Sequence, residues 1–271
     1  MDTVTHIILL TVSQLCQLLG CIFFFGFTLK WIGENTLKKF AHDHFLFHFM
    51  SIIGTPIHEF GHFIMCKLFG YRINKVVWVQ KPQADGTLGY VNFSYNPKNF
   101  YQLVGKFFVG IGPLFSGPLC ILLLLYFLLP TSFQVVETKI GHIPAVWQLS
   151  TFYDLFKLSG QFLVSLFTLE HVLSWQLYVF LIIASAIAVH IRLSISDLES
   201  ATSGIFSLSM ALLIINVFST FLGLTLSDHL SHYISTFTAY YIATMVIILV
   251  ISLLLWLLSI IWHTMLYRNA R

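Results

Sequence analysis

The chain has 271 residues, of which 57% are hydrophobic and only 9% are charged, and its formal net charge is +3. An ordinary soluble domain has about 25% charged residues, so this chain has too few charges to form the polar shell of a soluble protein. The small and dispersed net charge gives no support to nucleic-acid binding. We therefore expect one integral membrane domain covering residues 1–271.

Six apolar segments have the length that a membrane-spanning helix requires. The hydrocarbon core of a bilayer is about 30 Å thick and needs roughly 20 apolar residues per helix. The first segment lacks a basic n-region and a small-residue cleavage site, so we interpret it as a retained span rather than as a signal peptide. The sequence thus predicts an all-α polytopic membrane protein with spans near residues 7–29, 45–69, 103–129, 175–191, 205–226 and 237–262.

Residues 72–95, between the second and third segments, have the pattern of a β-hairpin. The stretch "INKVVWV" is rich in β-branched residues, and "LGYVNFSY" alternates apolar with polar residues. Ala84, Asp85 and Gly86 between them are typical turn residues. A solvated connecting loop is the alternative, but the length and the alternation favour the hairpin.

The distribution of Lys and Arg predicts the orientation in the membrane. With six spans, both termini lie on one side, which carries nine of these residues, whereas the other side carries five. Because cytoplasmic loops are enriched in Lys and Arg, we expect both termini in the cytoplasm. The short chain without appended domains favours the bacterial plasma membrane.

His58, Glu59 and His62 form the pattern H-E-x-x-H inside the second apolar segment. Residues i and i+4 of a helix lie on one face about one turn apart, so the two imidazoles can bind the same Zn²⁺ ion. Glu59 lies beside that ion and can take a proton from a bound water, whose pKa zinc lowers toward about 7. Ionisable groups at membrane depth are costly and are usually functional. The pattern is typical of a metallohydrolase.

A catalytic zinc site needs a third protein ligand, and the chain offers few candidates. Most other carboxylates fall in loops or on the opposite side of the membrane. Asp197 follows the fourth segment on the cytoplasmic side, toward which the H-E-x-x-H motif also lies, so we predict Asp197 as the third ligand. His190, seven residues earlier, is the alternative ligand or a partner of a ligand. Without a metal, Asp197 would be an interfacial helix cap and His190 a surface histidine.

The stretches "IHEFGHFIMCKLFG", "GTLGYVNF" and "GIGPLFSGPL" together resemble the site-2 protease family of intramembrane zinc metalloproteases. The resemblance covers Gly54 to about Leu129. It implies that His58 and His62 bind zinc, that Glu59 is the general base, and that a membrane-associated β-hairpin follows the motif helix. It further implies a substrate-handling role for five residues, namely Gly89, Tyr90, Gly112, Pro113 and Leu114. A kinked helix that serves only packing is the alternative for the last three.

Six spans with both termini inside are most similar to the short branch of that family, whose members act in bacterial sporulation signalling. The third ligand of the family usually lies in an N-P-D-G or L-D-G context, whereas "SISDLES" around Asp197 contains neither the proline nor the glycine. The chain also has no room for a PDZ or CBS domain. Substrate selection would therefore depend on the hairpin, the spans and partner proteins.

The leading hypothesis is a zinc metalloendopeptidase that cleaves peptide bonds in or near transmembrane segments of substrate proteins, with Zn²⁺ as cofactor. Its expected partners are a membrane-protein or peptide substrate, the lipid bilayer and a regulatory membrane partner, with no nucleic acid. A catalytically inactive zinc-binding scaffold or escort protein is the alternative, but such a protein would not need Glu59. A transporter would be expected to show inverted repeats or paired broken helices, and we detect neither.

Overall fold

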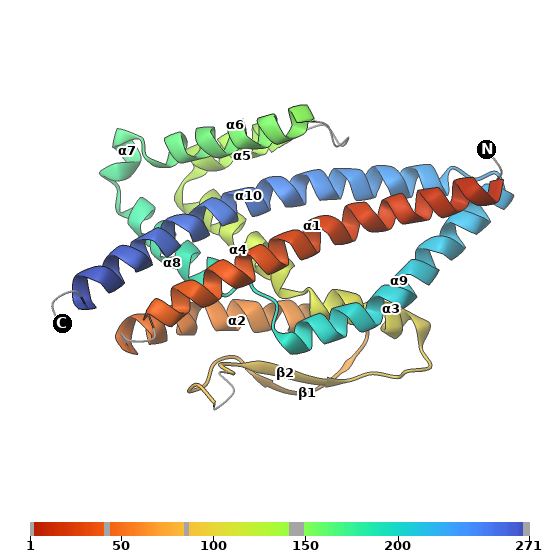
Figure 1. The fold of residues 1–271 in the computed structure, drawn as a ribbon, viewed down its shortest axis with the longest axis horizontal. Coiled ribbons are helices and arrows are strands. Elements are labelled where there is room, and N and C mark those ends of the chain that lie inside the picture. Colours follow the sequence, from red (N-terminus) through yellow and green to blue (C-terminus); the bar gives the residue numbers. More distant parts are fainter. Residues whose placement is uncertain (1–2, 41–43, 84–86, 141–148, 268–271) are drawn as a thin grey trace.

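The computed structural model describes residues 3–40, 44–83, 87–140 and 149–267. Ten helices and two strands make up this part of the chain (Figure 1). In chain order they are α1 (Thr3–Phe40), α2 (His44–Leu68), β1 (Arg72–Val77), β2 (Tyr90–Ser94), α3 (Phe100–Gly110), α4 (Pro113–Leu128), α5 (Pro130–Ile140), α6 (Leu149–Leu166), α7 (Leu169–Val172), α8 (Trp175–Ala188), α9 (Ile195–Phe221) and α10 (Leu226–Tyr267).

Three of the described helices, α1, α9 and α10, are long and apolar enough to cross a bilayer. The pair α3 and α4 is a fourth candidate if it is counted as one span, although the two helices are bent by 56° relative to each other. Pro113 opens α4, and proline has no backbone N–H with which to continue the hydrogen-bond ladder of α3. The predicted third span, residues 103–129, is thus broken in its first half. These helices indicate an integral membrane protein.

The other predicted spans differ from the observed helices in length or polarity. Segment 175–191 forms α8, which has only 14 residues and at 1.5 Å per residue covers about 21 Å. Segment 45–69 forms α2 as expected, but the polar residues of the H-E-x-x-H motif lower its mean hydropathy. The structure therefore supports three or four spans among the described residues, and the full number of six stays a prediction.

The predicted β-hairpin is confirmed as a two-stranded antiparallel sheet. Val77 of β1 lies opposite Tyr90 of β2, and the pairing is interrupted by a bulge between Ile73 and Lys75. Beyond the strands, the Gln80 backbone N–H donates to the Leu88 carbonyl over 2.7 Å. The predicted turn at residues 84–86 lies outside the described residues. The hairpin runs along one side of the helical body, next to α2 and α3 (Figure 1).

Two glycines bring the motif helix α2 into backbone contact with the start of α4. A Cβ atom added at Gly61 would lie 2.5 Å from the carbonyl carbon and oxygen of Gly112, and one at Gly112 would lie 2.6 Å from the same atoms of Gly61. Pro113 and Leu114, which follow, are buried in the same region. The structure thus places Gly112, Pro113 and Leu114 in helix packing directly behind the motif.

We expect Gly61→Ala to lower the stability of the fold. Its methyl group would force α2 and α4 apart, and overpacking of this kind typically costs about 1–3 kcal/mol. Gly20→Ala on α1 is the matched control, because no atom lies within 4 Å of the added Cβ and alanine favours helix over glycine. Thermal unfolding in detergent should show a lower midpoint for Gly61→Ala alone. Equal midpoints would show that the contact between the helices is not tight.

Candidate metal centre

Backbone carbonyls orient both histidines of the motif. The Nδ1 atom of His58 donates to the carbonyl oxygen of His190 over 2.9 Å, and Nδ1 of His62 donates to that of Val109 over 2.7 Å. A neutral imidazole that donates through Nδ1 keeps a lone pair on Nε2. This arrangement, in which a carbonyl fixes the tautomer, is typical of histidines that bind metal.

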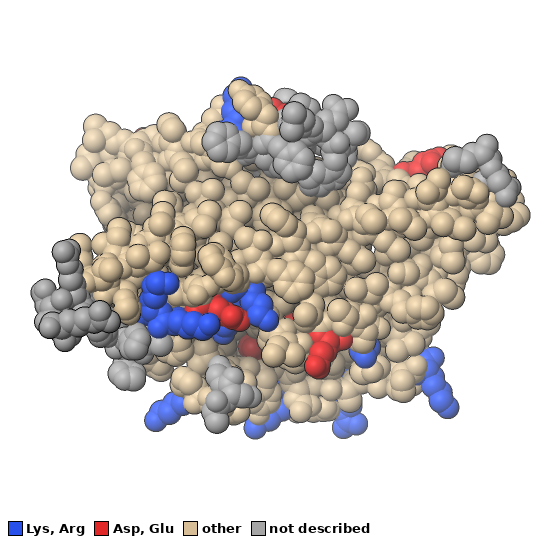
Figure 2. All heavy atoms as spheres, viewed as in Figure 1, with Lys and Arg blue, Asp and Glu red and all other residues tan. Residues whose placement is uncertain are grey.

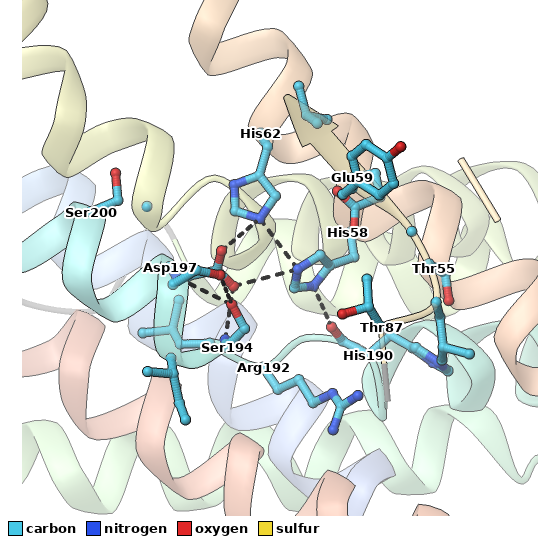
Figure 3. Close-up of a pocket in the computed structure, with 18 of the residues that line it drawn as sticks. Thr55, His58, Glu59, His62, Thr87, His190, Arg192, Ser194, Asp197 and Ser200 are labelled. Carbon is cyan, nitrogen blue, oxygen red and sulfur yellow. Dashed lines mark hydrogen bonds and ion pairs between the residues drawn. The ribbon is translucent and has the colours of Figure 1, made fainter. Parts of the chain in front are cut away.

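The free nitrogens converge with the carboxylate of Asp197 (Figure 3). The two Nε2 atoms lie 3.3 Å apart. Asp197 Oδ1 lies 3.1 Å from Nε2 of His62, and Oδ2 lies 3.6 Å from Nε2 of His58. All ligand atoms of the group are within 4.8 Å of one another. Three electron-pair donors this close together require a cation between them, either a proton or a metal ion. Two imidazole nitrogens and one carboxylate oxygen form a donor set that suits Zn²⁺.

The first turn of α9 fixes the position of Asp197. Ser194 caps the helix, because its hydroxyl accepts from the Asp197 backbone N–H over 3.1 Å, while Oδ2 of Asp197 accepts from the Ser194 backbone N–H over 2.8 Å. Close packing on α3 holds the same turn, since a Cβ atom at Gly110 would lie 2.4 Å from the Asp197 carbonyl oxygen. The carboxylate therefore contacts both histidines from a helix end that is itself constrained.

Polar contacts anchor the opposite end of α9. The side-chain amide of Asn216, which is fully buried, donates to Thr11 Oγ1 over 2.9 Å and to Gln14 Oε1 over 2.8 Å, both on α1. Gln14 in turn donates to Ser231 of α10 over 2.8 Å. Polar bonds between helices are favoured where no water can compete. They tie the far end of α9 to the two long helices α1 and α10.

Glu59 lines the same cavity as the candidate metal-binding group, but no hydrogen bond or ion pair joins its side chain to that group. Its side chain is 6% exposed, and it lines the same cavity as His58, His62 and Asp197. In the described part of the chain its carboxylate has no hydrogen bond or ion pair. It is therefore free to accept a proton from water in the cavity.

The side chain of His190 does not join the metal-binding group. It is buried, and its Nδ1 atom donates to the Ala186 carbonyl over 2.8 Å. Its Nε2 atom has no hydrogen-bond partner among the described residues. The predicted alternative ligand thus contributes through its main chain, because its carbonyl oxygen holds the ring of His58.

A cavity of about 620 Å³ opens in front of the centre, within the size range of sites that bind small molecules or short peptides. One wall is formed by β2 and the residues before it, including the predicted Gly89 and Tyr90. The cavity is also lined by Lys30 and Glu34 of α1 and by Arg192 of the segment between α8 and α9. These three charged residues belong to no sequence motif, and only their positions near the ends of apolar segments distinguish them in the sequence.

Comparisons with known proteins gave no match: no protein-family model, no curated protein and no solved structure is significantly similar to this chain. The site is therefore interpreted from its own geometry.

Proposed function

We propose that this protein is an intramembrane zinc metalloendopeptidase that cleaves peptide bonds in or near the transmembrane segments of other proteins. The observation that carries the proposal is the convergence of His58, His62 and Asp197 beside a free, buried Glu59 at the wall of a cavity. A binding site for a structural metal would normally be closed by a fourth protein ligand. Here the described residues supply three, and the cavity supplies room for water and a substrate.

Each residue has a distinct task in this reaction. Two imidazoles and one carboxylate hold the ion, which when bound would polarise the scissile carbonyl and acidify water. Glu59 takes a proton from the attacking water and passes it to the leaving amine. The His190 and Val109 carbonyls keep both imidazoles in the tautomer that presents Nε2 to the ion.

The hairpin provides a surface on which a substrate can extend. Tyr90, Val91 and Phe93 of β2 line the cavity, so an unwound substrate segment there would lie alongside an edge strand and could pair with its backbone. Gly89 allows this strand to approach α2 closely, because a Cβ atom there would lie 2.9 Å from the Thr55 side chain. The strand thus brings an extended peptide toward the metal centre.

The remaining features of the proposal follow from the sequence. They are six spans, both termini in the cytoplasm, a bacterial plasma membrane, membership of the site-2 protease family and a regulatory membrane partner. The basic residues along the hairpin side support the orientation. In Figure 2 they form a row along the lower edge of a surface that carries few other charges, and such enrichment is typical of cytoplasmic faces.

Metal removal tests the proposal directly. The full chain purified in a neutral detergent should contain about one zinc per molecule and should cleave members of a synthetic library of transmembrane peptides, with products identified by mass spectrometry. Treatment with 1,10-phenanthroline should remove the zinc and stop cleavage, and added Zn²⁺ should restore both, whereas Mg²⁺ should not. A folded protein without zinc, or cleavage that continues without metal, would contradict the assignment.

A further inference from the structure

Two cations line the cavity without a close partner. Lys30 and Arg192 both face it, and so does Glu34, but no ion pair within 4.0 Å joins these three residues to one another or to other described residues. The Arg192 side chain makes no hydrogen bond with the described residues. The hydrogen bond that Arg192 does make runs from its backbone N–H to the His190 carbonyl, over 2.9 Å. Its guanidinium is thus available to a ligand.

An unpaired guanidinium in this position is unusual. It carries five N–H donors in a rigid planar fork and stays protonated at neutral pH. Burial lowers the pKa of Arg192, and the nearby carboxylates of Glu34 and Asp197 raise it. These carboxylates are close enough to act on the charge but do not satisfy the donors. The fork is therefore matched to a planar carboxylate brought in from outside.

The charge balance of the cavity favours an anionic group at this end. Asp197 and Glu59 together carry two negative charges, which a divalent ion at the metal centre would neutralise. The two positive charges of Lys30 and Arg192 are then balanced only by the one negative charge of Glu34, which leaves an excess of one positive charge. Figure 2 shows basic and acidic side chains gathered above the hairpin, apart from the basic row along the lower edge.

The segment between α8 and α9 connects this cationic end to the metal centre. It contains His190, whose carbonyl orients His58, and Arg192, and it leads into Ser194 and Asp197 in the first turn of α9. A group bound by Arg192 would therefore lie in the same cavity as the candidate metal centre. Such a residue can determine which peptide bond enters the centre.

We propose that Arg192, assisted by Lys30, determines the specificity of the peptidase by binding an Asp or Glu side chain of the substrate near the cleaved bond. This inference rests on the proposed function. An acidic peptide fits better than a lipid phosphate, because residues of the β2 strand line the same cavity, and an extended peptide can pair along that strand. The preferred substrates are thus membrane proteins with a carboxylate close to the cleavage site.

Profiling with a peptide library tests this specificity. The zinc-loaded full chain is incubated with the library, and the best-cleaved peptide that contains Glu is then compared with its Gln counterpart. We expect kcat/KM to be about 10- to 100-fold higher for the Glu peptide, as charge-assisted bonds are stronger than neutral ones. Arg192→Gln should reduce this ratio to about one without loss of zinc. Glu34→Gln, which removes the competing carboxylate, should increase the ratio.

Control variants and a binding measurement separate the outcomes. Lys38→Gln, an exposed residue two turns beyond Lys30 on α1, should leave the ratio unchanged, whereas Lys30→Gln should lower it in part. Arg192→Glu should reverse the preference toward a Lys peptide. Cleavage without a preference for acidic residues, or a preference that persists in Arg192→Gln, would overturn the inference but not the proposed function.

If the wild type cleaves no peptide, the proposed function fails, and binding decides the inference. Acetyl-Ala-Ala-Glu-Ala-Ala-amide and its Gln counterpart are titrated calorimetrically into the Glu59→Gln protein with and without Arg192→Gln. Tighter binding of the Glu peptide that requires Arg192 supports an acidic subsite. Equal binding of both peptides would overturn the inference. So would a site that binds phosphatidylglycerol and releases it to inorganic phosphate but to neither peptide.

Discussion

Replacing Glu59 with glutamine should abolish peptide hydrolysis while the protein keeps its zinc. Glutamine has nearly the same shape but cannot take the proton from water, and a general base typically contributes about 100- to 10,000-fold to the rate. Because the Glu59 side chain makes no hydrogen bond or ion pair with His58, His62 or Asp197, the candidate metal-binding group should remain intact. Hydrolysis is measured by mass spectrometry of peptide products, and zinc by elemental analysis of the same sample.

Glu199→Gln provides the matched control for this experiment. Glu199 is exposed on α9, close in sequence to Asp197, so its replacement should change neither hydrolysis nor zinc content. Full activity in Glu59→Gln would exclude Glu59 as the base. Loss of zinc in Glu59→Gln would instead indicate that this carboxylate contributes to the metal-binding group itself.

The second large effect is expected at Asp197. Asp197→Ala should lower the affinity for zinc by more than about 100-fold, since even partners that only orient a ligand are worth about 10- to 100-fold. Two imidazole lone pairs would remain 3.3 Å apart with no carboxylate to help hold the ion. The affinity is measured by competition with a chromophoric chelator, using the full chain in detergent.

Ser194→Ala and His190→Gln distinguish the possible causes of such a loss. Ser194→Ala removes the hydroxyl that caps α9 but keeps the carboxylate, so zinc should be retained even if stability falls by about 1 kcal/mol. His190→Gln should also retain zinc, because the ring is bonded to Ala186 rather than directed at the centre. Zinc binding that survives in Asp197→Ala but is lost in His190→Gln would identify His190 as the third ligand.

The local part of the site could be predicted from the sequence. The i and i+4 spacing of His58 and His62 depends only on helical geometry, and the segment does form a helix. Asp197 emerged by elimination, which was effective because the chain has so few carboxylates. The alternative role of His190 as a ligand stays a prediction, and the shared helical face on which it was based assumed a continuous helix. In the structure α8 ends at Ala188 and α9 starts only at Ile195.

Features that depend on tertiary contacts could not be predicted. A hydropathy pattern does not distinguish a continuous span from the bent pair α3 and α4, because Ile111 and Gly112 at the bend are themselves compatible with an apolar segment. The contact between Gly61 and Gly112 joins two helices that are distant in the sequence. For the same reason, Lys30 and Arg192 could be assigned to one cavity only after α1 and the start of α9 had been placed.

The three candidate metal-binding side chains come from two helices that are far apart along the chain. This separation has a consequence for biosynthesis. The ribosome translates α2, with both histidines and Glu59, long before it translates α9. During that interval a nascent chain in the membrane lacks Asp197, together with the His190 carbonyl that orients His58. If the proposed function holds, the chain would become competent only when most of its length has been inserted. Prematurely terminated products that end before α9 would then be harmless to neighbouring membrane proteins.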